Sequence, residues 1–232
     1  MATGEVKVHA FMVKKAGLSD EDFHDHWRDP HGHLAMRVTE IIRYVQDHTY
    51  GTDPRFEGWA PLIYDGLPAV WFADIAAATG LHANPDFQES HADEENLVER
   101  SRLGWLRSTE TVIVPGPSAA PGDPERWKLT LLVVADPSED GFPRAIVDVV
   151  REVVDALPAL VRATVSLPRA DQYVQSPPLF DAVLEFAFGS RADLEAATGS
   201  PGFRRALPSI ERLIEPARSS AAWTYEERWI WP

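Results

Sequence analysis

Cysteine is absent from all 232 residues of the chain. Its absence excludes disulfide bonds, thiolate nucleophiles, iron–sulfur clusters and cysteine-based zinc sites. The first fifteen residues lack the basic and then apolar pattern of a secretory signal, and no apolar run approaches the about 20 residues that span a bilayer. We therefore expect a cytoplasmic protein without a membrane partner.

Positive charge is also scarce. The chain has 22 Lys and Arg residues against 36 Asp and Glu residues, which gives a formal net charge of -14. Because binding to a phosphate backbone needs a basic surface, this balance argues against nucleic acid as a partner. The hydrophobic share of 44% and the charged share of 25% are typical of a globular protein.

The common cofactor and hydrolase signatures are missing as well. The sequence contains no GxGxxG, GxxxxGK[ST], GxSxG or HExxH motif. On a helix, His24 and His26 would point about 200° apart and could not bind one ion. The sequence therefore gives no support to a nucleotide-binding, flavin-type Rossmann or serine-hydrolase function, and the histidine spacing argues against a metal site.

Histidine is missing from the second part of the chain, because all eight histidines lie within the first 91 residues. The densest cluster is HDHWRDPHGH, from His24 to His33. Within it, His31 directly follows Pro30, which disfavours helical geometry at Asp29. A side chain at this break can turn toward the open end of a sheet.

A stretch rich in Pro, Gly, Ser and Ala divides the chain into residues 1–116, a linker 117–126 and residues 127–232. Both halves read in the order βαββαβ, the ferredoxin-like arrangement of a four-stranded antiparallel sheet with two helices on one face. The fold class is therefore α+β. Because the other face of each sheet must be buried too, we expect the two sheets to face each other as a barrel.

The expected elements follow from apolar periodicity and from turn residues. In the first half they are strand Lys7–Lys15, a helix capped by Ser19, strands Ile41–Tyr50 and Pro68–Ile75, helix Pro85–Ser101 and strand Ser108–Val114. In the second half they are strand Trp127–Ala135, helix Arg144–Leu157, strands Ala163–Val174 and Ala182–Phe188, a helical region Arg191–Leu213 broken at Pro201 and Pro208, and strand Trp223–Trp231.

The second strand carries Tyr44, Gln46, His48 and Tyr50 on one face. This face suits the wall of a polar and aromatic pocket, where histidine exchanges protons and tyrosine orients oxygen atoms. The alternative is an edge strand that faces water.

Further candidates are spread over the first half. His9 is either a surface residue or a second pocket histidine, and His24 is either a solvated residue of the helix surface or part of the substrate site. His91, beside Glu94 on a helix, is either an oriented base or half of a surface pair. Candidates for an apolar lining are Trp27, Trp59 and Trp71, although Trp27 also fits the core. The alternating aromatic residues of the last strand, from Trp223 to Trp231, are expected to fill the barrel or an interface.

The segment GLSDEDFHDHWRDPHGHLA resembles the first-helix signature of the EthD family, within the dimeric α+β barrel superfamily. The matching residues are Gly17, Leu18, Ser19, Phe23, Trp27 and His31. Segments 41–49 and 64–75 resemble strands of the same family, and the second half is similar to a degenerate second copy. The resemblance implies a cofactor-free pocket enzyme in which His31 and His48 form the working pair and His9 lies where some barrel cyclases hold a strand histidine.

The leading hypothesis is a lyase, of dehydratase or cyclase type, for an aromatic or polyketide-like carbonyl compound. His48 or His31 would remove a proton and the other would donate one, while Tyr44 or Tyr50 stabilises an enolate. The alternatives are a cofactor-free monooxygenase for a phenol or ether and a ligand-binding accessory protein. The sequence leaves open whether the chain is a monomer or a homodimer.

Overall fold

The computed structural model describes residues 4–49, 56–116, 126–175 and 177–230. Its strands occur four in each half of the chain. They are β1 (Val6–Phe11), β2 (Ile41–Thr49), β3 (Ala69–Phe72), β4 (Gly104–Val114), β5 (Arg126–Val133), β6 (Leu160–Pro168), β7 (Ala182–Phe188) and β8 (Ser220–Ile230).

Helices connect these strands. They are α1 (Asp20–His26), α2 (Gly32–Ala35), α3 (Ile75–Thr79), α4 (Pro85–Leu97), α5 (Phe142–Val153), α6 (Gln172–Gln175), α7 (Arg191–Gly199) and α8 (Pro201–Glu211). Short helical turns are η1 (Trp27–His31), η3 (Leu81–Ala83), η4 (Arg100–Arg102), η5 (Val154–Ala156) and η6 (Pro216–Arg218).

The strands close into one antiparallel barrel in the order β1-β3-β2-β8-β5-β7-β6-β4. Each half contributes a sheet with the same internal order, β4-β1-β3-β2 in the first half and β8-β5-β7-β6 in the second. The sheets join where β2 pairs with β8 and where β4 pairs with β6. The α+β class and the expected closure of two sheets into a barrel are thus confirmed.

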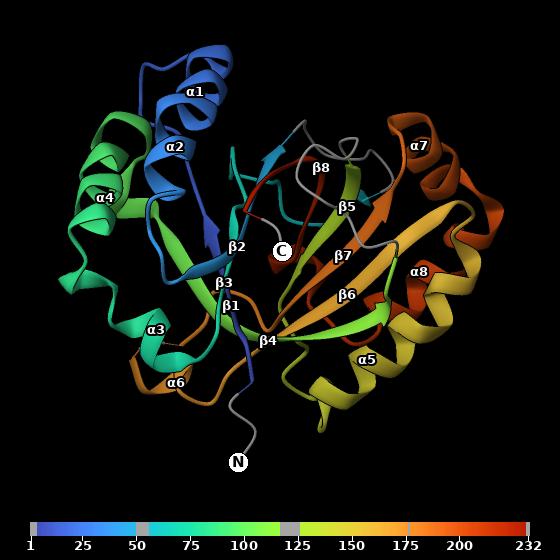
Figure 1. Cartoon of the computed structure of the whole chain (residues 1–232). Helices are drawn as coiled ribbons and strands as arrows, with labels where there is room; N and C mark the ends of the chain where they lie inside the picture. Colours follow the sequence, from blue (N-terminus) through green and yellow to red (C-terminus); the bar gives the residue numbers. More distant parts are fainter. Residues whose placement is uncertain (1–3, 50–55, 117–125, 176, 231–232) are drawn as a thin grey trace.

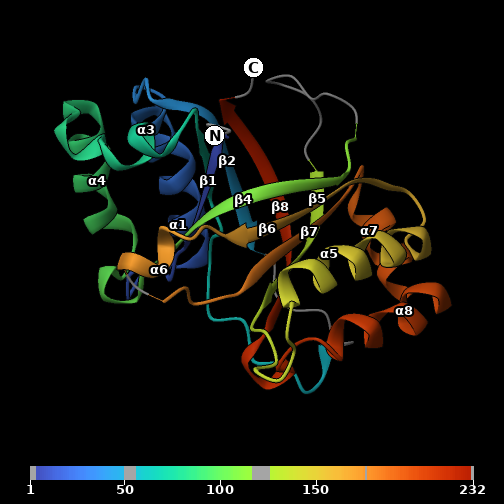
Figure 2. The same cartoon turned by 90° about the horizontal axis from the view of Figure 1, so that it is seen from below.

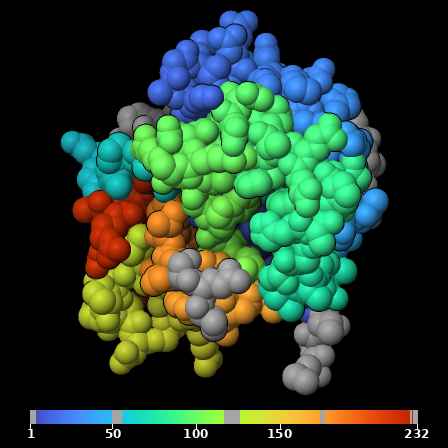
Figure 3. Space-filling view, turned by 90° about the vertical axis from the view of Figure 1, so that its left-hand side faces the viewer, coloured from blue at the N-terminus to red at the C-terminus, as the bar shows by residue number. Residues whose placement is uncertain are grey.

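The helices form two layers on opposite sides of the barrel. Figures 1 and 2 show α1, α2 and α4 over the sheet of the first half, and α5, α7 and α8 over the sheet of the second. In the space-filling view, α1 and α4 cover the upper part of one side of the molecule (Figure 3). Among the described residues, no helix combines the length and the apolar character needed to cross a membrane.

The second half holds the largest apolar core. Ile146, Val150 and Val153 on α5 face the sheet at helical spacing, and Phe203 and Ile210 on α8 join them. Each is buried, and full burial of such a side chain contributes about 1.5–3 kcal/mol. This core therefore accounts for much of the stability of the second half.

In the first half, helix α1 begins as expected, because the Ser19 side chain accepts a hydrogen bond from the Asp22 backbone N–H. Phe23 and Trp27 are fully buried against the sheet. The helix breaks at Asp29, whose backbone is extended (φ -147°, ψ 118°), as the following proline predicts.

Some expected elements were wrong in their details. Pro208 lies inside α8 instead of breaking it, whereas Pro201 occupies the first turn of that helix. The strand expected to reach Val174 ends at Pro168, and α6 follows it. These differences concern element ends, where local propensity is weakest and tertiary packing decides.

Candidate functional site

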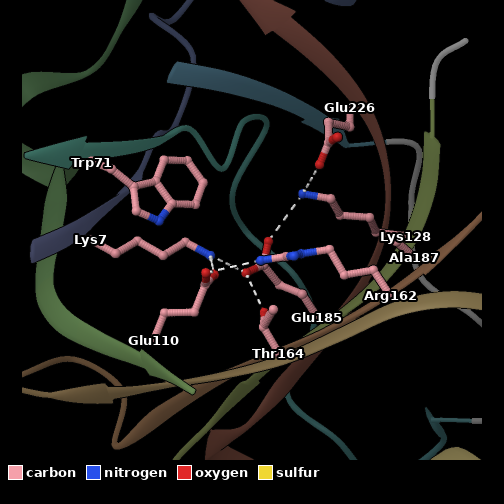
Figure 4. Close-up of a pocket in the computed structure, with 9 residues that line it drawn as sticks. All are labelled: Lys7, Trp71, Glu110, Lys128, Arg162, Thr164, Glu185, Ala187 and Glu226. Carbon is pink, nitrogen blue, oxygen red and sulfur yellow. Dashed lines mark hydrogen bonds and ion pairs between the residues drawn. The ribbon is translucent and has the colours of Figure 1, made fainter. Parts of the chain in front are cut away.

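Side chains that point into the barrel divide into an apolar and a charged layer. Phe11, Leu106, Leu132 and Val183 belong to an apolar cluster that fills one part of the interior. The charged layer, which we call the barrel charge network, is shown in part in Figure 4. It consists of Lys7, Asp47, Glu110, Lys128, Arg162, Glu185 and Glu226.

Ion pairs within the barrel charge network are short and buried. Lys128 Nζ lies 2.9 Å from Asp47 Oδ2 and 3.1 Å from Glu185 Oε1. Burial alone would lower the pKa of Lys128, but the surrounding carboxylates outweigh it and hold this pKa well above its usual value. Buried charges persist in proteins when they are paired in this way.

The cavity beside the barrel charge network is small. The part open to water has a volume of about 20 Å³, which is enough for about one water molecule. Sites for small organic ligands are commonly several hundred Å³. The cavity beside the barrel charge network is therefore too small for such a ligand.

His9 and Trp71, two of the predicted site residues, belong to this interior. His9 is buried in the barrel, and burial together with Lys7 lowers its pKa to about 3, so the ring is neutral. Trp71 lies between two cations, with Lys7 Nζ 4.6 Å and the Arg43 guanidinium carbon 5.0 Å from its ring centre. Their predicted part in substrate binding stays untested.

The face of β2 that carries Tyr44, Gln46 and His48 points toward the helices, and its role as the wall of a pocket stays a prediction. Tyr44 accepts a hydrogen bond of 3.3 Å from Trp27 Nε1, and Gln46 Nε2 donates one of 2.6 Å to the Trp27 carbonyl oxygen. The rings of Trp27 and His48 have centroids 4.4 Å apart. The opposite face, with Asp47, points into the barrel. Tyr50, the fourth residue of the predicted face, lies outside the described residues.

His24 on α1 and His48 on β2 meet through their side-chain nitrogens. Their Nδ1 atoms are 2.8 Å apart, so one ring donates its N–H and the other accepts it. His48 is 0% exposed, whereas His24 is half-buried. Burial lowers the pKa of His48, and burial and His48 together lower that of His24 to about 4. Two neutral imidazoles therefore share one hydrogen at neutral pH.

Glu227, on β8, brings a carboxylate from the second half of the chain to this pair. Its Oε2 lies 3.7 Å from His48 Nε2, and its Oε1 accepts a hydrogen bond of 2.8 Å from Arg28 Nε. Burial would raise the pKa of Glu227, but His48 and Arg28 more than offset this and lower it. We refer to His24, Trp27, Tyr44, Gln46, His48 and Glu227 as the helix-side cluster.

His31, the other half of the expected pair, has a different partner. Its Nδ1 lies 3.0 Å from Asp93 Oδ2 on α4, and His26 Nε2 lies 3.0 Å from the other oxygen of that carboxylate. Hydrogen bonds from His31 and His26 hold the pKa of Asp93 well below its usual range. His31 is thus buried, at 8% exposure, and engaged with Asp93, while His48 is engaged with His24.

The remaining candidates lie apart from these contacts. His91 on α4 stacks on Phe87, and its Nδ1 lies 2.9 Å from Oε2 of Glu94, a largely buried carboxyl group. Trp59 packs in the core of the second half and donates a hydrogen bond of 3.0 Å to Glu211.

The second half offers a direct comparison for the helix-side cluster. Its own second strand, β6, turns Ala163, Val165 and Leu167 toward the helices, where they pack in the apolar core. This arrangement shows that the fold itself does not need polar residues at such a place. Buried polar groups cost stability unless they are hydrogen-bonded, and on β2 they bond to the helix and to one another.

Sequence reasoning missed Glu227, Arg28 and Asp93. Glu227 is the single acidic residue in the aromatic alternation of the last strand, and this exception was the available signal. That alternation was expected to fill the barrel or an interface. Instead Trp223 packs against the core of the second half, and Glu227 faces the helices beside His48.

No group of three or more His, Asp or Glu side chains in the described part of the chain is arranged to hold a metal ion. His24 and His26 do point to different partners, as their spacing predicted.

Comparison with known families and structures places this geometry in context. The EthD domain model matches residues 15–101, which include α1, β2, β3 and α4. Over these residues the chain is similar to the EthD domain. His24, Trp27, Tyr44, Gln46 and His48 of the helix-side cluster lie within the matched segment, whereas Glu227 lies outside it.

Several solved structures share the fold along the whole chain. One, from Fusobacterium nucleatum and provisionally described as a monooxygenase, is 14% identical, with a TM-score of 0.63 over 97% of this chain and 93% of that one. An anthrone oxidase-like protein is 8% identical, with the same TM-score and coverage. A second provisional monooxygenase, from Lactobacillus acidophilus, is 8% identical, with a TM-score of 0.57 over 96% and 94%. No curated protein sequence matches the chain.

Proposed function

We propose that the protein is a cofactor-independent small-molecule enzyme that uses His24 and His48 to remove a proton from a carbon acid, such as an aromatic or polyketide-like carbonyl compound. The observation that carries the proposal is the hydrogen bond of 2.8 Å between the two imidazoles, on a polar face that the fold does not require. A pair of neutral imidazoles can accept one proton and return it, which is the basis of general acid–base catalysis.

The approach to the pair is from the side of His24. His24 is half-buried, while His48 is completely buried behind it. A substrate proton therefore passes to His24, and His48 stabilises the cation that forms by sharing the hydrogen between the rings. The proposal thus assigns to His24 the role of base, which the hypothesis from the sequence assigned to His31 or His48.

Tyr44 fits the role of hydrogen-bond donor in the same cluster. Burial raises the pKa of Tyr44, so its hydroxyl keeps the proton. The oxygen already accepts hydrogen bonds from Trp27 and Gln46, which leaves its own hydrogen for an acceptor such as an enolate oxygen.

The leading reaction class is a lyase step of dehydratase or cyclase type, in which the carbanion expels a leaving group or closes a ring. The second candidate is a cofactor-free oxygenase, which is favoured by the descriptions of the similar structures as monooxygenases and as anthrone oxidase-like. In that case a CH₂ group and O₂ give a carbonyl group and water. Both classes begin with the same removal of a proton.

The first experiment measures the removal of a proton from carbon, the step that both reaction classes share. A panel of aryl ketones and anthrone is incubated with the protein in deuterated water under argon, and deuterium uptake at carbon is followed by mass spectrometry. We expect uptake above the protein-free rate, and a loss of about 10²–10⁴-fold in His24→Ala and His48→Ala. The exposed His82 serves as the control, and His82→Ala should leave uptake unchanged.

Admitting oxygen then decides between the two classes. Oxygen consumption with formation of the ketone overturns the lyase assignment, whereas product formation without oxygen uptake supports it. If neither histidine variant changes the rate, the ligand-binding alternative replaces both enzyme hypotheses.

A further inference from the structure

We propose that Glu227 is a positioning residue that fixes the tautomer of His48 and thereby leaves the basic nitrogen of the pair on His24 Nε2. This inference rests on the proposed function and extends it, because it makes the second half of the chain a contributor to the site. The second half would then do more than complete the barrel.

The first step of the argument concerns His48. Its Nε2 lies 3.7 Å from the carboxylate oxygen Oε2 of Glu227, which is beyond hydrogen-bond range but close enough for the carboxylate charge to act on the dipole of the imidazole ring. An N–H directed at a carboxylate is attracted, whereas a nitrogen lone pair directed at it is repelled. Nε2 of His48 therefore carries the hydrogen, and since a neutral imidazole has only one N–H, Nδ1 is an acceptor.

The second step concerns His24. The two Nδ1 atoms are 2.8 Å apart, and an acceptor at His48 Nδ1 requires a donor at His24 Nδ1. His24 is then the tautomer whose Nε2 carries no hydrogen. The reverse arrangement would direct the lone pair of His48 Nε2 at the carboxylate of Glu227. Glu227 thus determines, through His48, which nitrogen of His24 is basic.

Glu227 is held in place by contacts with the first half of the chain. Arg28, which follows the helix of His24, donates a hydrogen bond of 2.8 Å to Glu227 Oε1 and also pairs with Asp25 at 3.0 Å. The pairing of β8 with β2 sets Glu227 opposite Gln46.

The other junction between the sheets shows what the fold places there without a site. Its strands β4 and β6 set Thr109 opposite Leu167 and Thr111 opposite Val165. These side chains bring neither a carboxylate nor an imidazole to the corresponding place. The carboxylate at the junction of β2 with β8 is therefore a feature of the site and not of the barrel.

The experiment reads the tautomers directly and needs no substrate. The full chain is labelled with ¹⁵N in its histidine rings, and two-bond ¹⁵N–¹H correlation spectra assign each ring nitrogen of His24 and His48 at neutral pH. We expect a hydrogen on Nε2 of His48 and on Nδ1 of His24. A hydrogen on Nδ1 of His48 in the unaltered protein overturns the proposal, whatever any variant does.

Two variants complete the test, and each replaces one carboxylate that pairs with Arg28. Glu227→Gln removes the charge beside His48 and should shift both rings toward the opposite tautomers and lower deuterium uptake by about 10-fold or more. Asp25→Asn removes an exposed carboxylate that also pairs with Arg28 and should leave both spectra and uptake unchanged. Spectra of Glu227→Gln that match those of the unaltered protein overturn the positioning role. If the unaltered protein shows the expected tautomers but takes up no deuterium, the proposed function has failed and the positioning role stands.

Discussion

Lys128 on β5 and Asp47 on β2 form an ion pair of 2.9 Å across the interior of the barrel, and so connect strands from the two halves of the chain. The same ammonium group also pairs with Glu185 and Glu226. Because it balances several buried carboxylates at once, we expect the barrel to depend on it strongly.

Replacing Lys128 with methionine tests this dependence. Lys128→Met removes this ammonium group from the buried carboxylates that it contacts, and breaking a buried ion pair from one side costs about 3–5 kcal/mol. The free energy of unfolding, measured by urea denaturation, should fall by about that amount. As a control, Arg144→Met makes the same change of charge at an exposed pair with Asp148 and should cost less than about 1 kcal/mol. Equal effects of the two substitutions would contradict a structural role for the barrel charge network.

We expect His48 to contribute to activity and not to the stability of the fold. His48→Leu removes a completely buried imidazole whose Nε2 has no hydrogen-bond partner among the described residues. We expect the free energy of unfolding to be unchanged or about 1 kcal/mol higher, while deuterium uptake is lost. The reverse substitution, Val165→His on β6, puts an imidazole into the apolar core and should cost about 2 kcal/mol or more. A large loss of stability in His48→Leu would indicate that His48 is mainly structural.

Glu94 should make stability depend on pH. Burial raises its pKa to about 7, so between about pH 4.5 and pH 7 the folded chain holds a proton that the unfolded chain has lost. Its contribution to the free energy of unfolding therefore falls as the pH rises through this window, by about 3 kcal/mol at the most.

The measurement compares urea denaturation at pH 5 and at pH 8. Glu94→Gln cannot lose a proton, so its stability relative to the unaltered protein should be higher at pH 8 than at pH 5. Glu89→Gln, at an exposed position of the same helix, should show no such difference between the two pH values. A constant effect of Glu94→Gln at both pH values would refute the raised pKa.

Gly32 gives the ring of Trp229 room beside the site. A Cβ atom at Gly32 would lie 2.5 Å from Trp229 Cζ2, so Gly32→Ala forces the indole ring to move. We expect a loss of about 1–3 kcal/mol and, because Trp229 lies two residues from Glu227 on the same face of β8, a lower rate of deuterium uptake. Gly4→Ala, where nothing lies within 4 Å of the added methyl group, is the control for both measurements. The prediction fails if the two variants behave alike.

Much of the fold was determined by local sequence patterns. The apolar runs, the Ser19 cap and the turn residues predicted the order of the strands and main helices in both halves, and the repeat of that order predicted the closed barrel. These features are local or repeated, so one sequence is enough to recognise them. The alternation of Tyr44, Gln46 and His48 was also correct, because side chains alternate between the faces of any strand.

Only the tertiary structure decided which way that face points and what it meets. Alternation shows which residues share a face, but it does not show whether the face turns toward helices or toward a second sheet. Asp47, on the opposite face of β2, points into the barrel, where its partner Lys128 comes from the other half of the chain. Glu227 reaches His48 only because β8 pairs with β2 when the barrel closes, and such long-range pairing leaves no trace in the neighbouring sequence.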